Sequence, residues 1–346
     1  MATHAEPSSE TAPLGLDDAK ATRNLRHGLI SLVVLIAMAV GLFLAVPSLH
    51  DVAHQVLHMP PGWVALAIGL ELLSCVGYVV CFLQVFDRAP IRFGARVALS
   101  ELAFGAAVAL GGAGSVAVGA WLLIERGARP GPVAERSAVL FLLTSAINLI
   151  TLALAGLGLW TQVLPGKHDP LLSLLPGGIG VVVFVGFLLL PWVTDRTLGA
   201  RPCGRIGTWS RATSETIRDT RKLLFRADWR LLGAFGYLWF DIAVLWVCFR
   251  ALGHTPPLST IVLAYQIGYL SNLIPIPGGI GVLDGSFVGM FVLFGINDTT
   301  ATSATIVYHA ISLWVPATWG TIAFLLLRRS RSQPVTWRRP RAERRA

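Results

Sequence analysis

The chain has 346 residues, of which 54% are hydrophobic and 14% are charged, and its mean hydropathy is +0.65. These values and several runs of about 20 apolar residues predict an integral membrane protein, with no stretch long and polar enough for a separate soluble catalytic domain. The four cysteines follow neither a metal-ligand nor a disulfide pattern, so we expect no metal and no cofactor.

The net charge of +9 reflects the sidedness of the loops, so no nucleic-acid partner is expected. Assigning the loops alternately to two sides puts every Lys and Arg except Lys167 and Arg250 on one side. By the positive-inside rule, that side is the cytoplasm. We therefore place the N-terminal tail 1–27, the basic loop 195–230 and the basic tail 328–346 at the inner face of the bacterial cytoplasmic (inner) membrane. The C-terminal tail is expected to meet anionic lipid, unless its charge serves only to set the topology.

Six apolar segments are long enough to span the bilayer, and together they define a single membrane domain. This domain extends over residues 28–327. In chain order, the segments are 28–46, 63–86, 138–160, 176–194, 231–252 and 303–327. The predicted fold is an all-α polytopic membrane protein. An even number of crossings leaves both termini on one side, in agreement with the charge pattern.

Two further apolar segments, 97–124 and 259–295, are each interrupted by a glycine cluster. Segment 97–124 begins and ends beside cytoplasmic arginines, so it cannot be one crossing, and its arms of about 13 residues are too short to span singly. We predict a re-entrant hairpin that enters from the cytoplasm, and segment 259–295 is predicted to enter from outside. In the alternative, both hairpins are pairs of short tilted helices, which gives about eight to ten helices in all.

The glycine clusters at Gly111 and Gly278 lie 167 positions apart, and the same offset superimposes the apolar segments that flank them. Residues of about 28–160 and 176–327 therefore form two halves with the same order of elements. The first half starts from the inside and the second from the outside, which predicts an inverted-topology repeat. In such a repeat the hairpin tips are expected to meet near the midplane and to form a binding site.

Four acidic residues within the apolar segments are candidate site residues: Glu71, Glu101, Asp241 and Asp284. Each would cost roughly 2.5–3.5 kcal/mol at the centre of a lipid-facing helix, so we expect these side chains to face an interior cavity. Glu101 is the closest of the four to a membrane surface and is the weakest candidate. For each residue, the alternative is a buried polar contact that only locks helix packing.

The glycine clusters expose backbone N–H groups at the start of a half-helix, which suits a lipid phosphate. If Gly281 is the N-cap of the second arm, Asp284 is the third residue of that helix, where the helix dipole favours a carboxylate. Asp284 is then either a helix cap alone or a group that also meets a cation or carries a proton.

Tyr265, Tyr269 and Asn272 follow i, i+4, i+7 spacing and form one polar and aromatic face. Aromatic packing with one buried amide competes there with a head-group contact. Tyr308 and His309 lie near the outer end of the last predicted span, where a lone histidine is more typical of an interface than of a proton carrier.

The run from Asn272 to Asp284, NLIPIPGGIGVLD, followed by Tyr308, resembles the hallmark of the flippase-like membrane domain of lysylphosphatidylglycerol synthases and their stand-alone relatives. The stretch Gly111–Gly127 and Asp241, which lies between two tryptophans, resemble further features of that family. The resemblance covers the whole predicted membrane domain. It implies a lipid-handling protein without the synthase domain.

The chain departs from the family pattern in having Asp284 where Glu is usual and His309 where Arg commonly follows the tyrosine. These departures concern the substrate more than the fold. The predicted substrate-binding residues are Glu71, Gly111, Gly112, Gly114, Asp241, Asn272, Pro275, Pro277, Gly278, Gly279, Gly281, Asp284 and Tyr308.

The predicted function is that of a lipid translocator, which moves a phospholipid or another polar-headed lipid between leaflets through a midplane cavity. The sequence has no Gly-x4-Gly-Lys-Ser/Thr motif, so transport would be passive or ion-coupled. One alternative is a scaffold or regulator of envelope lipid or glycan assembly. Another is an intramembrane lipid-modifying enzyme, but His-Glu-x-x-His and Gly-x-Ser-x-Gly are both missing, so we predict that the protein is not an enzyme. A second copy of the chain is a further candidate partner.

Overall fold

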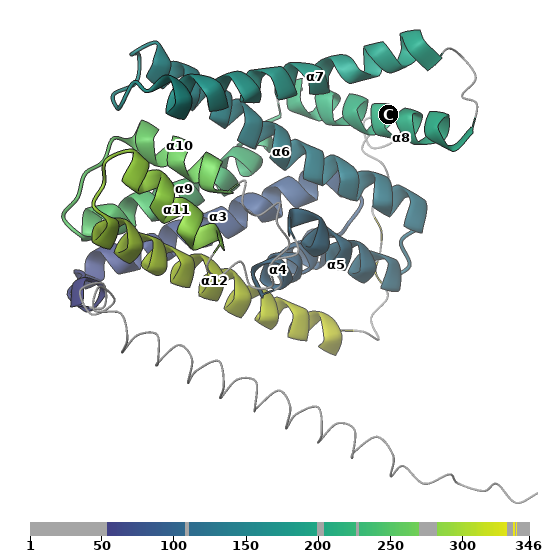
Figure 1. The fold of residues 1–346 in the computed structure, drawn as a ribbon. Helices are drawn as coiled ribbons and strands as arrows, with labels where there is room; N and C mark the ends of the chain where they lie inside the picture. Colours follow the sequence, from purple (N-terminus) through teal and green to yellow (C-terminus); the bar gives the residue numbers. More distant parts are fainter. Residues whose placement is uncertain are drawn as a thin grey trace, which may run out of the picture. The chain divides into compact units, whose positions relative to one another are not determined.

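The computed structural model describes residues 54–107, 111–198, 204–225, 228–269 and 282–330, with residues 335 and 337. For some helix ends, including 111–114 and 282–284, only the backbone is described. The regular elements within these ranges are all helical (Figure 1), and they belong to one compact unit that begins at Gln55. In chain order they are α3 (Pro61–Val85), α4 (Ile91–Ala107), α5 (Gly111–Glu125), α6 (Pro130–Trp160), the π-helical turn η1 (Pro170–Leu174), α7 (Leu175–Leu198), α8 (Gly204–Phe225), α9 (Leu231–Ala251), α10 (Leu258–Tyr269), α11 (Val282–Leu293) and α12 (Asp298–Arg329).

Within the described ranges, five helical segments are long and apolar enough to cross a membrane. They are Pro61–Val85, Pro130–Trp160, Pro170–Arg196, Leu231–Ala251 and Asp298–Arg329. These segments correspond to five of the six predicted spans, and the sixth, 28–46, lies outside the described residues. The prediction of an all-α polytopic membrane protein is therefore confirmed.

Two helices extend beyond the apolar segments that predict them. The predicted start at 138 is wrong for α6, which begins at Pro130 after an extended Arg129. Proline suits the first helical position because its missing N–H would have no partner there. The start of α12 is set by Asn297, whose side chain accepts hydrogen bonds from two backbone N–H groups of the first turn. A proline at the first position of α6 and an asparagine cap before α12, and not hydropathy, thus mark where these helices begin.

The predicted hairpins are two pairs of adjacent helices, α4 with α5 and α10 with α11 (Figure 1). The arms of the first pair have 17 and 15 residues, which is more than predicted, and those of the second have 12 each. At 1.5 Å per residue, the longest arm reaches about 25 Å, short of the ~30 Å hydrocarbon core. The first glycine cluster lies within the opening turn of α5. The second, with the rest of 270–281, lies outside the described residues.

The centre of the bundle is the crossing of α3 and α9, which pack closely along each other. Glycines permit this approach, since a Cβ atom added at Gly77 would lie 2.6 Å from the backbone nitrogen of Tyr237. A Cβ atom added at Gly233 would lie 2.8 Å from the carbonyl oxygen of Gly77. Small residues at a crossing let membrane helices approach through their backbones. The Ser74 hydroxyl adds a hydrogen bond of 2.8 Å to the carbonyl oxygen of Tyr237.

Candidate functional site

Asp241, on α9, is the acceptor at the centre of the candidate site. The hydroxyl of Tyr308 on α12 donates to its carboxyl group, with O–O distances of 3.1 and 3.0 Å to the two oxygens. The hydroxyl of Tyr265 on α10 donates to the same group. Both tyrosines are buried. One carboxyl group therefore joins α9, the first arm of the second hairpin and the last long helix.

Glu71, on the facing helix α3, is the second acid of the site. Its side chain is 5% exposed, and its Oε2 atom has no hydrogen-bond partner among the described residues. The Glu71 and Asp241 carboxyl groups are close enough to interact with each other directly. We call these two residues the carboxyl pair. The ion pairs found among the described residues all involve other acids, so no Lys or Arg in those ranges neutralises the carboxyl pair.

Aromatic rings hold the two tyrosines of the site in place. Tyr265 stacks on Tyr269 at a centroid distance of 5.5 Å and meets the Tyr308 ring edge-on at 6.2 Å. Phe287 of α11 contacts both Tyr265 and Tyr308, at 5.5 and 5.8 Å. The absent side chain of Gly268 makes room for the Phe287 ring, because a Cβ atom there would lie 2.3 Å from it. The second hairpin thus supplies a packed wall that aims one hydroxyl at Asp241.

A separate tyrosine–carboxyl contact lies between α3 and the first hairpin. Glu101 of α4 is 1% exposed and accepts a hydrogen bond of 2.5 Å from the hydroxyl of Tyr78 on α3. Gly119 of α5 closes this contact from the other side, since a Cβ atom there would lie 1.9 Å from Glu101 Oε2. The sequence places Glu101 nearest to the membrane surface, but the fold encloses it between three helices.

The predicted site residues have three kinds of outcome. The structure brings together Glu71, Asp241 and Tyr308. It places the backbone of Gly111, Gly112 and Gly114 in the first turn of α5. Helix α11 begins at Val282, so Asp284 is the third residue of that helix, as expected for a Gly281 cap. Six of the predicted residues lie outside the described ranges: Asn272, Pro275, Pro277, Gly278, Gly279 and Gly281.

Tyr265 and Tyr237 are near the carboxyl pair but are not among the predicted substrate-binding residues. The i, i+4 spacing of Tyr265 and Tyr269 is visible in the sequence, but it does not reveal that a carboxylate lies opposite. Tyr237 interacts with both acids of the pair, and its ring contacts that of Tyr78 at 5.0 Å. Only the crossing of α3 and α9 brings these groups together.

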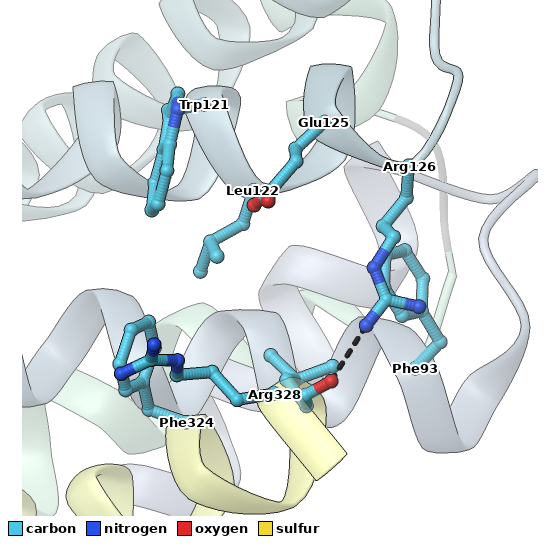
Figure 2. A pocket seen from close by; sticks show the side chains of 8 residues that line it. Phe93, Trp121, Leu122, Glu125, Arg126, Phe324 and Arg328 are labelled. Atoms are coloured by element: carbon cyan, nitrogen blue, oxygen red, sulfur yellow. Dashed lines mark hydrogen bonds between the residues drawn. The ribbon is translucent and has the colours of Figure 1, made fainter. Parts of the chain in front are cut away.

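A cleft at the far end of α12 contains none of the predicted site residues (Figure 2). Arg126 extends from the end of α5 and donates hydrogen bonds to the carbonyl oxygens of Leu327, at 2.6 Å, and Ser330, at 3.2 Å. Its guanidinium group also lies 5.9 Å from the centroid of the Phe93 ring. The arginine therefore satisfies carbonyl groups that the end of α12 leaves free, and it ties the first hairpin to that helix. The cleft is lined by Phe93, Trp121, Leu122, Glu125, Arg126, Phe324, Leu327 and Arg328.

Known proteins similar to this chain are membrane proteins. The family model described as the lysylphosphatidylglycerol synthase TM region matches residues 28–320. A UPF0104 membrane protein of Methanothermobacter thermautotrophicus is 24% identical over 328 residues, which are 84% of this chain and 90% of that protein. A UPF0104 membrane protein of Methanocaldococcus jannaschii is 31% identical over 91 residues, which are 26% of this chain and 27% of that protein. The region matched by the family model includes the carboxyl pair, Tyr265 and Tyr308.

Proposed function

Starting from the fact that the chain belongs to the family of lysylphosphatidylglycerol synthase TM regions, we propose that it translocates a polar-headed lipid between membrane leaflets without an ATPase of its own. The observation that carries the proposal is the carboxyl pair, which lies between two helices that are apolar enough to span the membrane. Glu71 has a buried oxygen without a partner among the described residues, so the pair can accept another polar group.

The cost of the carboxyl pair supports a functional role. An acidic side chain at the centre of a membrane helix is unfavourable by about 2.5–3.5 kcal/mol on insertion scales. Such groups usually mark substrate or ion pathways and face the interior of a bundle. A contact that only locks helices would be expected to pair each carboxyl group with a donor, as Tyr78 does for Glu101. At the carboxyl pair, one acid has two donors and the other is left incomplete.

The contacts between helices support an inverted repeat. The offset of 167 positions relates α3 to α9, α4 to α10 and α6 to α12. The packing of α12 on α4 then has a counterpart in the packing of α10 on α6, and α5 on α6 corresponds to α11 on α12. In addition, a tyrosine–carboxyl bond joins the long helix to the first hairpin arm in each half, Tyr78–Glu101 and Tyr265–Asp241. Inverted repeats of this kind suit alternating access to a midplane site.

We place both termini and the loop 195–230 in the cytoplasm, on the evidence of the basic residues. The membrane is then the cytoplasmic membrane of the cell. In this orientation the cleft at the end of α12 lies at the inner face. Its aromatic and guanidinium groups are typical of a membrane interface.

Lipid movement in vesicles tests the proposed function. The purified protein is reconstituted with a fluorescent head-group-labelled phospholipid, and a membrane-impermeant reductant reports how fast inner-leaflet lipid becomes accessible. We expect faster accessibility than in protein-free vesicles, and a loss of about tenfold or more, equivalent to ~1.4 kcal/mol in the barrier, for Asp241→Asn. Glu135→Gln, which changes an exposed carboxylate on α6, is the matched control and should keep the full rate.

The outcome separates the candidate functions. If folded wild-type protein moves no lipid faster than protein-free vesicles do, for any head group tried, translocation is refuted and a scaffold or regulator becomes the better candidate. A chemically altered lipid recovered from the same vesicles would instead indicate an intramembrane enzyme.

A further inference from the structure

We propose that the carboxyl pair binds and releases a proton during each transport cycle, so that lipid movement is coupled to proton movement. The inference rests on the proposed function and deepens it, because it names the ion that drives the cycle. It starts from the geometry of two acids on facing helices, one with two hydroxyl donors and one with a buried oxygen that lacks a partner.

The charges around the pair require a proton. Two carboxyl groups in direct contact within a low dielectric cannot both be ionised without a cation, since each negative charge disfavours the other. Arg230 and Arg250 lie at the two ends of α9, and are 11 and 9 residues away from Asp241. At 1.5 Å per residue these separations are about 16 and 14 Å along the helix, too far for an ion pair. The pair therefore holds a shared proton when no other cation is present.

The other titratable groups that face the pair are a thiol and four phenol hydroxyls. They are Cys75 of α3, Tyr237 of α9, Tyr265 and Tyr269 of α10, and Tyr308 of α12. His309 follows Tyr308 in the sequence, but successive residues point about 100° apart around a helix. Within the described residues, no permanently charged side chain competes with a proton for the pair.

The direction of the hydrogen bonds favours a proton over a metal cation. Both tyrosine hydroxyls donate to Asp241, so their hydrogens, and not their lone pairs, face its carboxyl oxygens. A hard metal cation would need about six oxygen ligands with lone pairs directed at it. It would have to turn both hydroxyls away from Asp241, and the aromatic wall of Phe287 and Tyr269 holds the Tyr265 ring in place. A proton needs no such rearrangement.

The proposed step is a simple exchange with water. When a proton binds, an O–H bond forms on one carboxylate oxygen of the pair and the charge of the site changes from −2 to −1. When a cationic part of a lipid head group binds to the pair, that O–H bond breaks, the proton passes to water on the other side of the membrane, and the cation compensates the −2 charge. Binding of the next proton returns the charge of the pair to −1 and releases the head group.

Two other acids of the chain, Glu101 and Glu135, provide controls for substitutions in the carboxyl pair. The Glu101–Tyr78 contact is also a buried tyrosine–carboxyl hydrogen bond, but it has one acid and no second carboxyl group. Glu101→Gln retains an acceptor for Tyr78 and changes a buried acid without altering the pair. Glu135→Gln changes an exposed acid. The test variant is the double substitution Glu71→Gln with Asp241→Asn, which removes both acids of the pair and keeps their shapes.

Infrared spectroscopy tests the proton without requiring transport. At about pH 8, exposed carboxyl groups are ionised, so a carboxylic-acid C=O band reports buried protonated acids. We expect this band in the wild-type protein and a smaller band in the double variant. The part of the band that the double substitution removes should be as large in Glu101→Gln as in the wild type. Identical carboxylic-acid bands in wild type and a folded double variant would overturn the proposal.

Transport under a pH gradient tests the coupling. We expect the wild type, Glu101→Gln and Glu135→Gln to change their lipid translocation rate several-fold when the gradient is imposed or reversed, and the double variant to show one low rate throughout. Translocation that ignores the pH gradient, or that follows a sodium gradient instead, overturns the coupling and leaves the proposed function standing. No lipid movement under any condition overturns both, and the infrared result is unaffected by it.

Discussion

Asp241 and Glu71 carry the same functional group but differ in their hydrogen bonds. Asp241 accepts from two buried tyrosines, whereas Glu71 has an oxygen with no partner in the described part of the chain. A buried polar group without a partner has an unfavourable free energy of about 1–3 kcal/mol. The site therefore stabilises one acid through its neighbours and leaves the other available for a ligand.

Removal of one donor to Asp241 should lower stability. In Tyr265→Phe the ring and its stacking on Tyr269 remain, but the half-buried carboxyl group of Asp241 loses a hydrogen bond. We expect the free energy of unfolding to fall by about 1–3 kcal/mol, measured by denaturation in detergent. Tyr237→Phe is the control, because that hydroxyl makes no hydrogen bond to a described residue, and its stability should stay within about 0.5 kcal/mol of wild type. Equal losses in both variants would contradict the assigned role of Tyr265.

Substitution of Asp284, in the first turn of α11, tests whether this residue does more than cap the helix. Asp284→Asn keeps the shape and most of the hydrogen-bonding capacity but removes the charge, which the helix dipole favours and the low dielectric disfavours. We expect a folded protein with nearly normal thermal stability that has lost most of its lipid translocation. Normal translocation in the well-folded variant would reduce this residue to a helix cap.

The close crossing of α3 and α9 is the element on which the site depends, because the two acids are carried on its two helices. Gly77 and Gly233 bring the backbones together, and the Ser74 hydroxyl links α3 to a carbonyl oxygen of α9. Neither helix could approach the other this closely with larger side chains at those glycines. The separation of Glu71 from Asp241 is thus set by glycines elsewhere on the same helices.

Substitution of Gly77 should therefore disturb the site from a distance. In Gly77→Ala the new methyl group would meet backbone atoms of Tyr237 and Gly233 at 2.6 and 2.7 Å, so the helices must move apart. We expect a loss of about 1–3 kcal/mol in the free energy of unfolding and a lower translocation rate. Gly69→Ala, on the same helix, meets no atom within 4 Å and should be neutral or stabilising by up to about 1 kcal/mol. If the two variants behave alike, the glycine crossing is not what positions the site.

The described part of the molecule combines long helices with the two pairs of shorter helices at the predicted hairpins, and the described length of each of these arms is too short to cross the bilayer singly. Contacts between the first hairpin and α12, and between α10 and α6, join each half of the chain to the other. Arg126 fastens the first of these joints through the end of α12. Because the two halves pack on each other in this way, we expect all helices of the bundle to take one common orientation in the membrane.

Cysteine labelling tests that orientation. In a background with the four native cysteines replaced, Arg329→Cys at the end of α12 should react with an impermeant reagent only after the membrane is opened. Val163→Cys, in the loop after α6, is 78% exposed and should react in intact cells. The physical reason is the retention of basic loops in the cytoplasm. Labelling of Arg329→Cys in intact cells would reverse the proposed topology.

The sequence by itself determined the class of the protein, the location of the five spans that the structure describes and the helix start at the first glycine cluster. Apolar runs of about 20 residues predict spanning helices because a helix satisfies its own backbone polar groups within the bilayer, so hydropathy and length were enough to predict α3, α9 and the apolar part of α12. Gly111 likewise stands at the start of α5, at the first glycine cluster. The motif that ends at Asp284 was the main basis of the family resemblance.

Only the tertiary structure decided which polar groups meet. Glu71, Asp241, Tyr265 and Tyr308 come from four helices, and their convergence depends on the crossing of α3 and α9 and on the wall of the second hairpin. The enclosure of Glu101 by Tyr78 and Gly119 is a further example, since hydropathy places that acid nearest the surface. Local sequence specifies helices through interactions within a few residues, whereas these contacts depend on side-chain volumes at distant crossings.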